Sequence, residues 1–252
     1  MANEDLMQTI DRTMQILKSF STEEKELSLA DLHHKLKLSK SSLQRILNTL
    51  IHHGVIEKDD KKKTYQLGIE LLFLGQLVEK NSHLLSISKP HMEKLRDEFG
   101  ESVSLNIINK NKRQCIGYVS GGHELTTITY VGQTSPLYAG ASAKLLMAYL
   151  PTDELTELLN DIEFMQITDK TIMNREKLIQ ELSRVHRDGY AISYGERVKG
   201  AFSLCAPIRN RFNEVIAGVT LMIPDVRVAE KKIDQYIEHV KITGAMISRE
   251  FI

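Results

Sequence analysis

The strongest constraint on the fold of this chain is a change of hydrophobic period at Gly54, inside the stretch LSKSSLQRILNTLIHHGVIEKDDKKKTYQLG at residues 38–68. Before the glycine, apolar side chains recur at i, i+3, i+4 and i+7, the spacing of one helix face. These side chains are Leu43, Ile46, Leu47 and Leu50. Ser39 is the expected N-cap of that helix and Gly54 its expected C-cap. After the glycine, VIEKDDKKKTYQLG predicts a strand, a polar turn and a second strand.

Two further helices are expected before this segment. Residues 6–20 carry apolar side chains at helical spacing. The next helix begins at Ser28, which forms a capping-box pattern with Asp31 three residues later. Three helices followed by a small hairpin is the element order of a winged helix-turn-helix, and we assign residues 1–68 to such a domain.

The charge of this segment is uneven, although the whole chain has a formal net charge of +0. Between Lys35 and Lys63 there are eight cationic and three anionic side chains, the local excess that a phosphate backbone requires. A helix of this kind fits the major groove, so we expect its polar face to contact bases and the hairpin lysines to contact phosphates. The candidate DNA-binding residues are Ser28, Lys40, Ser41, Ser42, Gln44, Arg45, Asn48, Lys61, Lys62, Lys63 and Tyr65.

Residues 69–82 form the next expected element, a linker helix with a strongly apolar surface. The sequence IELLFLGQLVEKN places Leu71, Leu74 and Val78 on one stripe of that helix. A small domain has little core in which to bury such a helix. We therefore expect it to pair with a second copy of the chain, and the alternative is packing against the next domain of the same chain.

Residues 83–252 mix helical and strand patterns, which predicts a second domain of the α+β class. A helix is expected over residues 84–99 and a long helix near the end of the chain. Strand-like runs lie at residues 102–108, 114–121, 125–131, 190–196, 202–210 and 215–224, with helical runs between the first three and the last three. Strands bracketed by helices favour a largely antiparallel sheet.

Motifs in both parts of the chain resemble one known family. The segment SLADLHHKLKLSKSSLQRILNTLIHHGVIEKDDKKKTYQLGIELLFLG is similar to the N-terminal domain of IclR-family transcriptional regulators. SPLYAGASAKLLMAYLP, DGYAISYGE and SLCAPIRNRFNEVIAGVTLMIP resemble the C-terminal domain of that family, so the resemblance spans nearly the whole chain. It implies a regulator that binds double-stranded operator DNA, pairs its protomers through a linker helix and binds a small metabolite in a GAF-like domain at residues 83–252. It also implies a homodimer or homotetramer; most such proteins are repressors and some are activators.

The resemblance further implies which residues contact the effector. Carried over by motif, they are Tyr138, Ala139, Gly140, Ala141, Ser142, Ser193, Glu196, Ser203, Cys205, Thr220 and Met222. A helix N-terminus at Gly140 suits an anion, so we expect a carboxylate-bearing or polar metabolite. Many relatives carry an acidic pair where this chain has Ser193 and Tyr194, which leaves the polarity of the effector open.

The sequence also bears on other functions. It has no HExxH, no P-loop and no GxGxxG after a strand, so we expect no enzyme, no cofactor and no metal. The alternative is a small-molecule-processing enzyme or a metal-dependent sensor that uses Cys205 or Cys115 in the C-terminal domain. The chain shows no long apolar run and an acidic N-terminus without an apolar signal core, so we expect a cytoplasmic protein with no membrane partner.

Overall fold

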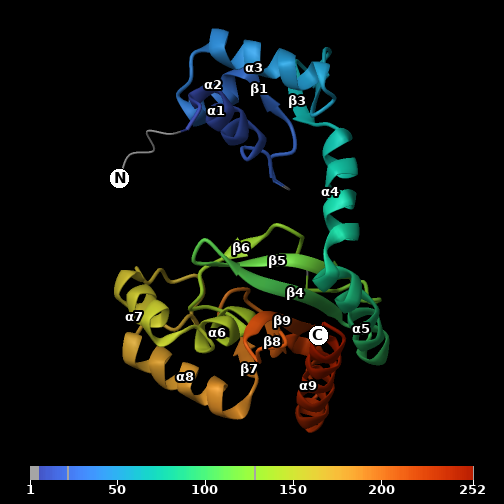
Figure 1. Ribbon diagram of the computed structural model, residues 1–252, viewed down its shortest axis with the longest axis vertical. Helices are drawn as coiled ribbons and strands as arrows, with labels where there is room; N and C mark the ends of the chain where they lie inside the picture. The colour runs from blue at the N-terminus through green and yellow to red at the C-terminus, as the bar shows by residue number, and fades with distance from the viewer. Residues whose placement is uncertain (1–5, 22, 128, 252) are drawn as a thin grey trace. The chain divides into compact units, whose positions relative to one another are not determined.

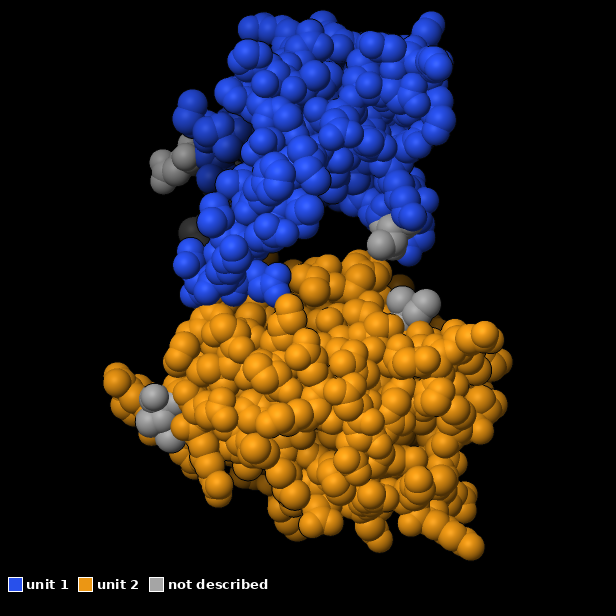
Figure 2. Space-filling view, turned by 90° about the vertical axis from the view of Figure 1, so that its right-hand side faces the viewer, with its two compact units in different colours: residues 1–81 blue, residues 82–252 orange. Residues whose placement is uncertain are grey.

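The computed structural model describes residues 6–21, 23–127 and 129–251, and the chain divides into two compact units (Figures 1 and 2). The first unit comprises residues 1–81 and the second residues 82–252. Each unit has its own buried apolar core. No helix in the described part of the chain combines the length and apolar character needed to cross a bilayer.

The first unit contains three helices, a small sheet and a fourth helix. In chain order these are α1 (Gln8–Leu17), β1 (Leu27–Ser28), α2 (Leu29–Leu36), α3 (Lys40–His52), β2 (Ile56–Asp59), β3 (Thr64–Leu67) and α4 (Glu70–Asn81). The three strands form an antiparallel sheet in the order β1-β3-β2. Ile16 of α1, Leu32 of α2 and Leu47 of α3 meet in the core, and Ile56 of β2 covers it from the hairpin.

Side-chain caps define where the helices of this unit begin. Ser28 and Asp31 form the expected capping box at the start of α2. At α3, the Ser39 hydroxyl accepts a hydrogen bond from the Ser42 amide at 3.3 Å. The C-cap of α3 is His53, not the expected Gly54. Gly54 follows it at φ +66°, a left-handed conformation in which a Cβ is strained, and so turns the chain into β2.

Helix α4 leaves its apolar side chains on the surface. None of its residues is buried. Five large apolar residues are at least half exposed, namely Leu72, Phe73, Leu74, Leu77 and Val78. A helix with this much accessible apolar surface is typical of a protein–protein contact.

The second unit is an α+β domain built on one antiparallel sheet. In chain order its elements are α5 (His83–Phe99), β4 (Ser102–Asn109), β5 (Lys112–Val119), β6 (Thr134–Ser135), α6 (Ala141–Ala148), α7 (Thr152–Asp161), α8 (Arg175–Asp188), β7 (Ala191–Tyr194), β8 (Ala201–Arg209), β9 (Val215–Pro224), two short 3-10 turns (Asp225–Arg227 and Glu230–Lys232) and α9 (Ile233–Glu250). The strand order is β6-β5-β4-β9-β8-β7. Helices α5 and α9 cover one face of the sheet, and α6 with α7 and α8 lies on the other (Figure 1).

Side chains on β4 and β9 alternate between these two faces, as strand geometry requires. Leu105 and Val219 point into the core beneath α5 and α9. Their polar neighbours Ser104 and Thr220, which are direct cross-strand partners, point to the opposite face. One face of the sheet is therefore an apolar core, and part of the other is a polar floor.

The prediction of a strand over residues 125–131 is wrong for the residues described there, because residues 125–127 and 129–131 belong to no strand. Residue 128 lies outside the described part. The chain meets β5 only later, where the Cys115 amide donates to the Gln133 carbonyl and Ser135 pairs with Arg113. Thr127 and Thr129, two of the β-branched residues that suggested a strand, are instead buried beside the polar floor.

Candidate functional site

The first candidate site is the polar face of α3. The helix buries its apolar stripe in the core of the first unit. The opposite face is solvent-accessible: Lys40, Ser41, Arg45 and Asn48 are exposed, while Ser42 and Gln44 are half-buried. Ser41, Ser42 and Arg45 also line a groove shared with Thr9 and Thr13 of α1. The side chains on this face can donate to phosphates and to base edges.

Two of the expected DNA-binding residues have structural roles here. Tyr65 is buried, only 3% exposed, and its hydroxyl accepts a hydrogen bond from Gln44 Nε2 at 3.4 Å. Gln44 Nε2 also donates to Asn48 Oδ1 at 2.9 Å, so Tyr65 helps to orient this pair and does not itself lie on the surface. The Ser28 hydroxyl donates to Asp31 Oδ2 at 2.7 Å within the capping box, which occupies the proton that a phosphate contact would need.

The hairpin after α3 carries three consecutive exposed lysines with different partners. Lys62 Nζ forms an ion pair with Glu26 Oε1 at 2.9 Å, and this hydrogen bond raises the pKa of Lys62. The backbone amides of Lys61 and Lys62 donate to Asp59, which shapes the turn. Among the described residues, no ion pair holds Lys61 or Lys63, whose ammonium groups are free to meet a phosphate.

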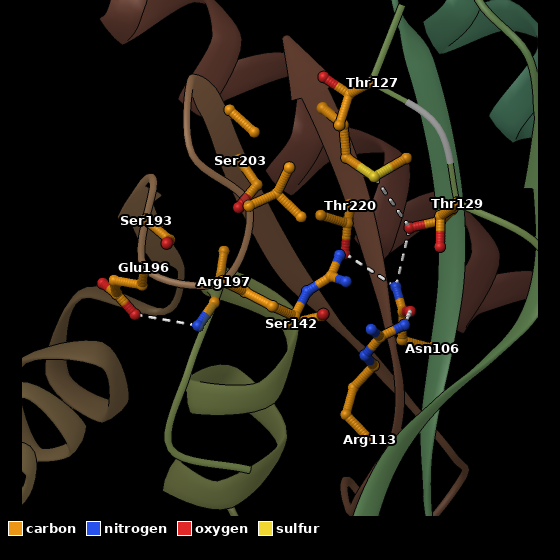
Figure 3. Close-up of a pocket in the computed structure, with 16 residues that line it drawn as sticks. Asn106, Arg113, Thr127, Thr129, Ser142, Ser193, Glu196, Arg197, Ser203 and Thr220 are labelled. Carbon is orange, nitrogen blue, oxygen red and sulfur yellow. Dashed lines mark hydrogen bonds between the residues drawn. The ribbon is translucent and has the colours of Figure 1, made fainter. Parts of the chain in front are cut away.

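The second candidate site is a cavity of about 440 Å³, including its mouth, on the polar face of the second unit's sheet (Figure 3). Many of the residues carried over by motif line it: Gly140, Ala141, Ser142, Ser193, Glu196, Ser203, Thr220 and Met222. The floor comes from β4 and β9, and one wall comes from the N-terminus of α6.

Three residues expected to contact an effector lie away from the cavity lining. The Tyr138 hydroxyl donates to the Met165 carbonyl at 3.1 Å and accepts from the Met165 amide at 3.0 Å, and so ties down the loop before α8. Ala139 is buried in the core around α6. Cys205 is fully buried in that same core, because its position on β8 packs against α6.

Two arginines are the main residues that sequence reasoning missed. Arg113 of β5 is buried, and its Nε donates to Ser135 Oγ at 2.9 Å while Nη1 donates to Asn106 Oδ1 at 3.1 Å. Arg197, in the turn after β7, also lines the cavity. Figure 3 shows both guanidinium groups turned toward the middle of the cavity. Other lining residues not foreseen are Ser104, Asn106, Thr127, Thr129, Val198 and Ala201.

Burial affects both arginines, and the charge of Arg197 also affects Arg113. Burial first, and the charge of Arg197 second, lower the pKa of Arg113 to about 10. Burial also lowers the pKa of Arg197. Both groups stay protonated at neutral pH, so the cavity holds two positive charges. No local pattern marked Arg113, which stands between Lys112 and Gln114 in the sequence.

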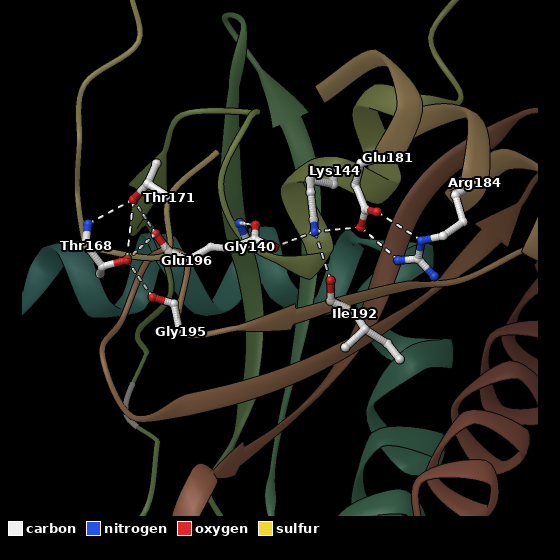
Figure 4. A network of polar contacts seen from close by, with 9 residues as sticks. All are labelled: Gly140, Lys144, Thr168, Thr171, Glu181, Arg184, Ile192, Gly195 and Glu196. Carbon is white, nitrogen blue, oxygen red and sulfur yellow. Dashed lines mark hydrogen bonds and ion pairs between the residues drawn. The ribbon is translucent and has the colours of Figure 1, made fainter. Parts of the chain in front are cut away.

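Beside the cavity lies a buried ion-pair network centred on Lys144 of α6 (Figure 4). Lys144 Nζ contacts Glu196 Oε1 at 2.5 Å and Glu181 Oε1 at 2.8 Å, and it also donates to the Ile192 carbonyl. Glu181 is held as well by Arg184, and the hydrogen bonds from Arg184 and Lys144 lower its pKa to about 2. The network joins α6, α8 and the β7–β8 turn.

Glu196 changes the expectation for the start of α6. Its Oε2 accepts a hydrogen bond from the Gly140 amide at 2.9 Å (Figure 3). A carboxylate of the protein therefore already occupies part of the helix N-terminus where an effector carboxylate was expected. The strongest unoccupied anion partners in this cavity are the arginines.

The two cysteines have the properties of core residues. Both are buried free thiols, and burial raises the pKa of Cys115 and raises that of Cys205 to about 12. A protonated thiol is a poor nucleophile and a poor metal ligand. Within residues 6–21, 23–127 and 129–251, no three His, Cys, Asp or Glu side chains are placed to hold a metal ion together.

Comparison with known proteins covers both units. The family model for the C-terminal domain of the bacterial transcriptional regulator IclR matches residues 76–249, and the model for the IclR helix-turn-helix domain matches residues 9–60. The transcriptional regulator KipR of Bacillus subtilis is 31% identical over 242 residues, which is 96% of this chain and 96% of that protein. The motifs SPLYAGA and GYAISY also resemble the KipR type.

Other relatives give the same result. The transcriptional regulator KdgR of Escherichia coli is 27% identical and covers 99% of this chain and 97% of its own length. The crystal structure of an IclR homolog from Microbacterium hydrocarbonoxydans, complexed with 4-hydroxybenzoate, has a TM-score of 0.85 at 20% identity, over 97% of this chain and 99% of that one. The two-domain fold expected from the motifs is confirmed, and the chain belongs to the IclR family of DNA-binding transcriptional regulators.

Proposed function

We propose that this regulator is a repressor that binds a double-stranded DNA operator through α3 and the following hairpin, and that a small molecule in the cavity of the second unit modulates this binding. The observation that carries the proposal is the face of α3 opposite its buried stripe. That face is accessible, rich in donors, and followed directly by a cationic hairpin.

The residues on this surface divide into two roles. Arg45 and Asn48 are exposed on α3 and match the geometry of contacts to guanine and adenine edges. Lys61 and Lys63 are point charges on a turn, which suits phosphate contacts that do not read sequence. Lys62 joins them by exchanging Glu26 for a phosphate, a small cost because both groups are exposed.

The effector is a carboxylate-bearing or polar metabolite. Hydroxyl groups of Ser104, Ser142, Ser203 and Thr220 surround the cavity together with the arginines, so its lining favours a polar anionic ligand over an apolar one. A protein with the same fold binds 4-hydroxybenzoate, which is also a small carboxylate. The buried, protonated thiols support a regulator with no catalytic centre.

The protein works as a homodimer or a tetramer of such dimers. The exposed apolar side chains of α4 would be covered by the same helix of a second copy. Two DNA-binding units in one dimer would match two operator half-sites. Its place of action is the cytoplasm, where chromosomal DNA is accessible.

The test begins with operators found by chromatin immunoprecipitation and sequencing of the native protein. Fluorescence anisotropy then compares an operator with random DNA for the wild type and for Arg45→Ala. We expect Arg45→Ala to weaken operator binding by about 1–3 kcal/mol and random DNA much less. The matched control, Arg211→Ala, removes an exposed arginine from the β8–β9 turn and should change neither. Equal losses on both DNAs would contradict the role given to α3.

A further inference from the structure

We infer that the cavity of the second unit is selective for a dianion, a ligand whose two negative charges are shared between Arg113 and Arg197. The inference rests on the proposed effector site and names the class of ligand that this site takes. It depends on the pattern of partners around the two guanidinium groups, and each step below concerns one part of that pattern.

Arg113 presents an unused donor group to the cavity. Its Nε and Nη1 are bonded to Ser135 and Asn106, but its Nη2 has no hydrogen-bond partner among the described residues. The side chain is 2% exposed. Buried donors are almost always satisfied, and an unsatisfied one on a charged group is especially costly. A donor kept in this state beside a cavity is explained by a ligand that accepts from it.

Arg197, which is half-buried, is the second guanidinium at the cavity. It lies against the start of α6, since a Cβ built on Gly140 would meet its Nε at 3.9 Å. No hydrogen bond or ion pair joins its guanidinium to another residue in the described part of the chain. Glu196, its neighbour in sequence, is the one acid among the described residues that line the cavity, and that carboxylate is bound to Lys144 and to the Gly140 amide instead.

The surrounding network leaves the two arginines without a counter-charge. Lys144 and Arg184 are balanced by Glu181 and Glu196, to which they are paired. At the outer end of α8, Asp188 contacts Arg184 at 3.6 Å and pairs with Arg187 at 2.9 Å. What remains in the cavity is the double positive charge of Arg113 and Arg197, and the lowered pKa of each agrees with burial that is not compensated.

A dianion matches this arrangement better than a monoanion. A single carboxylate bound to Arg113 would neutralise that arginine and leave Arg197 without a counter-charge. Two negative charges neutralise both arginines and remove the repulsion between them. Arginine binds carboxylates and phosphates through the same planar fork. The shared chemistry is therefore two negative charges, supplied either by a short dicarboxylate or by a phosphate monoester.

Binding is measured on the full chain without DNA, by calorimetry and thermal unfolding. The dicarboxylate probes are succinate and glutarate, the phosphate probes are methyl phosphate and inorganic phosphate, and succinamate is the monoanion matched to succinate. We expect at least one dianion to raise the Tm and to bind about tenfold or more tightly than the monoanion, as a second charge-assisted contact predicts. The better of the two probe classes identifies the source of the charge. Succinamate binding as tightly as every one of the dianions, or no Tm response to any of the four dianions, would overturn the inference.

The variant Arg197→Gln tests the site without depending on the choice of probe. Because it removes a half-buried charge that has no acid partner among the described residues, we expect it to raise the Tm of the ligand-free protein by a few degrees and to abolish the preference for dianions. Arg211→Gln, the exposed control, should alter neither property. A lower Tm together with an unchanged dianion preference would show that Arg197 is structural and would overturn the inference. Operator binding by anisotropy is a separate readout, so a regulator that still recognises its DNA but shows no charge preference refutes this inference alone.

Discussion

The hairpin of the DNA-binding unit and the cavity of the second unit use positive charge in opposite ways. In the hairpin, Lys61, Lys62 and Lys63 are exposed, and Lys62 has an acid partner that it can exchange at little cost. In the cavity, Arg113 and Arg197 lie together, and neither has an acid partner among the residues that the structure describes. Water screens the lysines, so each contributes weakly and without selectivity. Burial, nearly complete for Arg113 and partial for Arg197, makes a charge without a partner costly, so both arginines can discriminate between ligands.

The largest expected effect comes from the buried ion pairs that support the cavity. Replacing Lys144 by Met leaves Glu196 and Glu181 short of a partner in a site where Lys144 itself is 1% exposed. We expect the free energy of unfolding to fall by about 3–5 kcal/mol, measured by urea denaturation. The control Lys112→Met, at the exposed start of β5, should stay within about 0.5 kcal/mol of wild type. A small effect of Lys144→Met would mean that this region does not differ from the surface.

Acid should weaken the same network as Glu181 becomes protonated. Hydrogen bonds from Arg184 and Lys144 depress the pKa of Glu181 from 4.5 to about 2. A carboxyl group with a depressed pKa contributes its full stabilisation when the pH is above the ordinary pKa of the group, here 4.5. This contribution is lost progressively as the pH falls toward 2. Urea denaturation at several pH values should show that wild type and Glu181→Gln differ most above pH 4.5 and converge as the pH falls. A constant difference would contradict the assignment.

The hairpin lysines should appear mainly in the salt dependence of DNA binding. Lys61 has no ion-pair partner in the described part of the chain, so a phosphate contact by this residue releases counterions without breaking a bond within the protein. For Lys61→Ala we expect the slope of log affinity against log salt to become shallower by about 1 on operator and random DNA alike. Anisotropy titrations at several salt concentrations provide the measurement. A loss confined to the operator would show that Lys61 reads bases.

The smallest expected effect concerns the acid that holds Lys62. In Glu26→Gln the ion pair at 2.9 Å is lost and Lys62 becomes available to phosphate. Affinity for random DNA should therefore rise a few-fold at low salt, and the gain should vanish at high salt because the charges are exposed. The matched variant Asp60→Asn removes the acid that pairs with Lys58. It shows whether the loss of any acid in the hairpin raises the affinity for random DNA. Weaker binding by Glu26→Gln would indicate that Glu26 orients Lys62 toward the DNA.

Several local features were predictable because they depend on neighbouring residues. The capping box of Ser28 and Asp31 needs contacts only three residues apart. The stripe on α3 follows from the 3.6-residue period, and the turn at Gly54 follows from the freedom of glycine at positive φ. Other features depended on distant partners. Tyr65, expected both as an apolar contact of the hairpin and as a DNA contact, is buried in the core of the first unit, and residues 125–131 resembled a strand although the described ones belong to no strand.

By itself, the sequence determined the order of helices and hairpin, the polar face of α3, and the motifs that mark the family, because hydrophobic period, caps and charge runs act over a few neighbouring positions. Only the tertiary structure decided the chemistry of the cavity. Arg113 and Arg197 come from β5 and from the turn after β7, far apart in the chain, and sheet register together with the burial of Lys144 brings them into one space. Whether a charge finds a partner depends on such long-range packing, which no local pattern encodes.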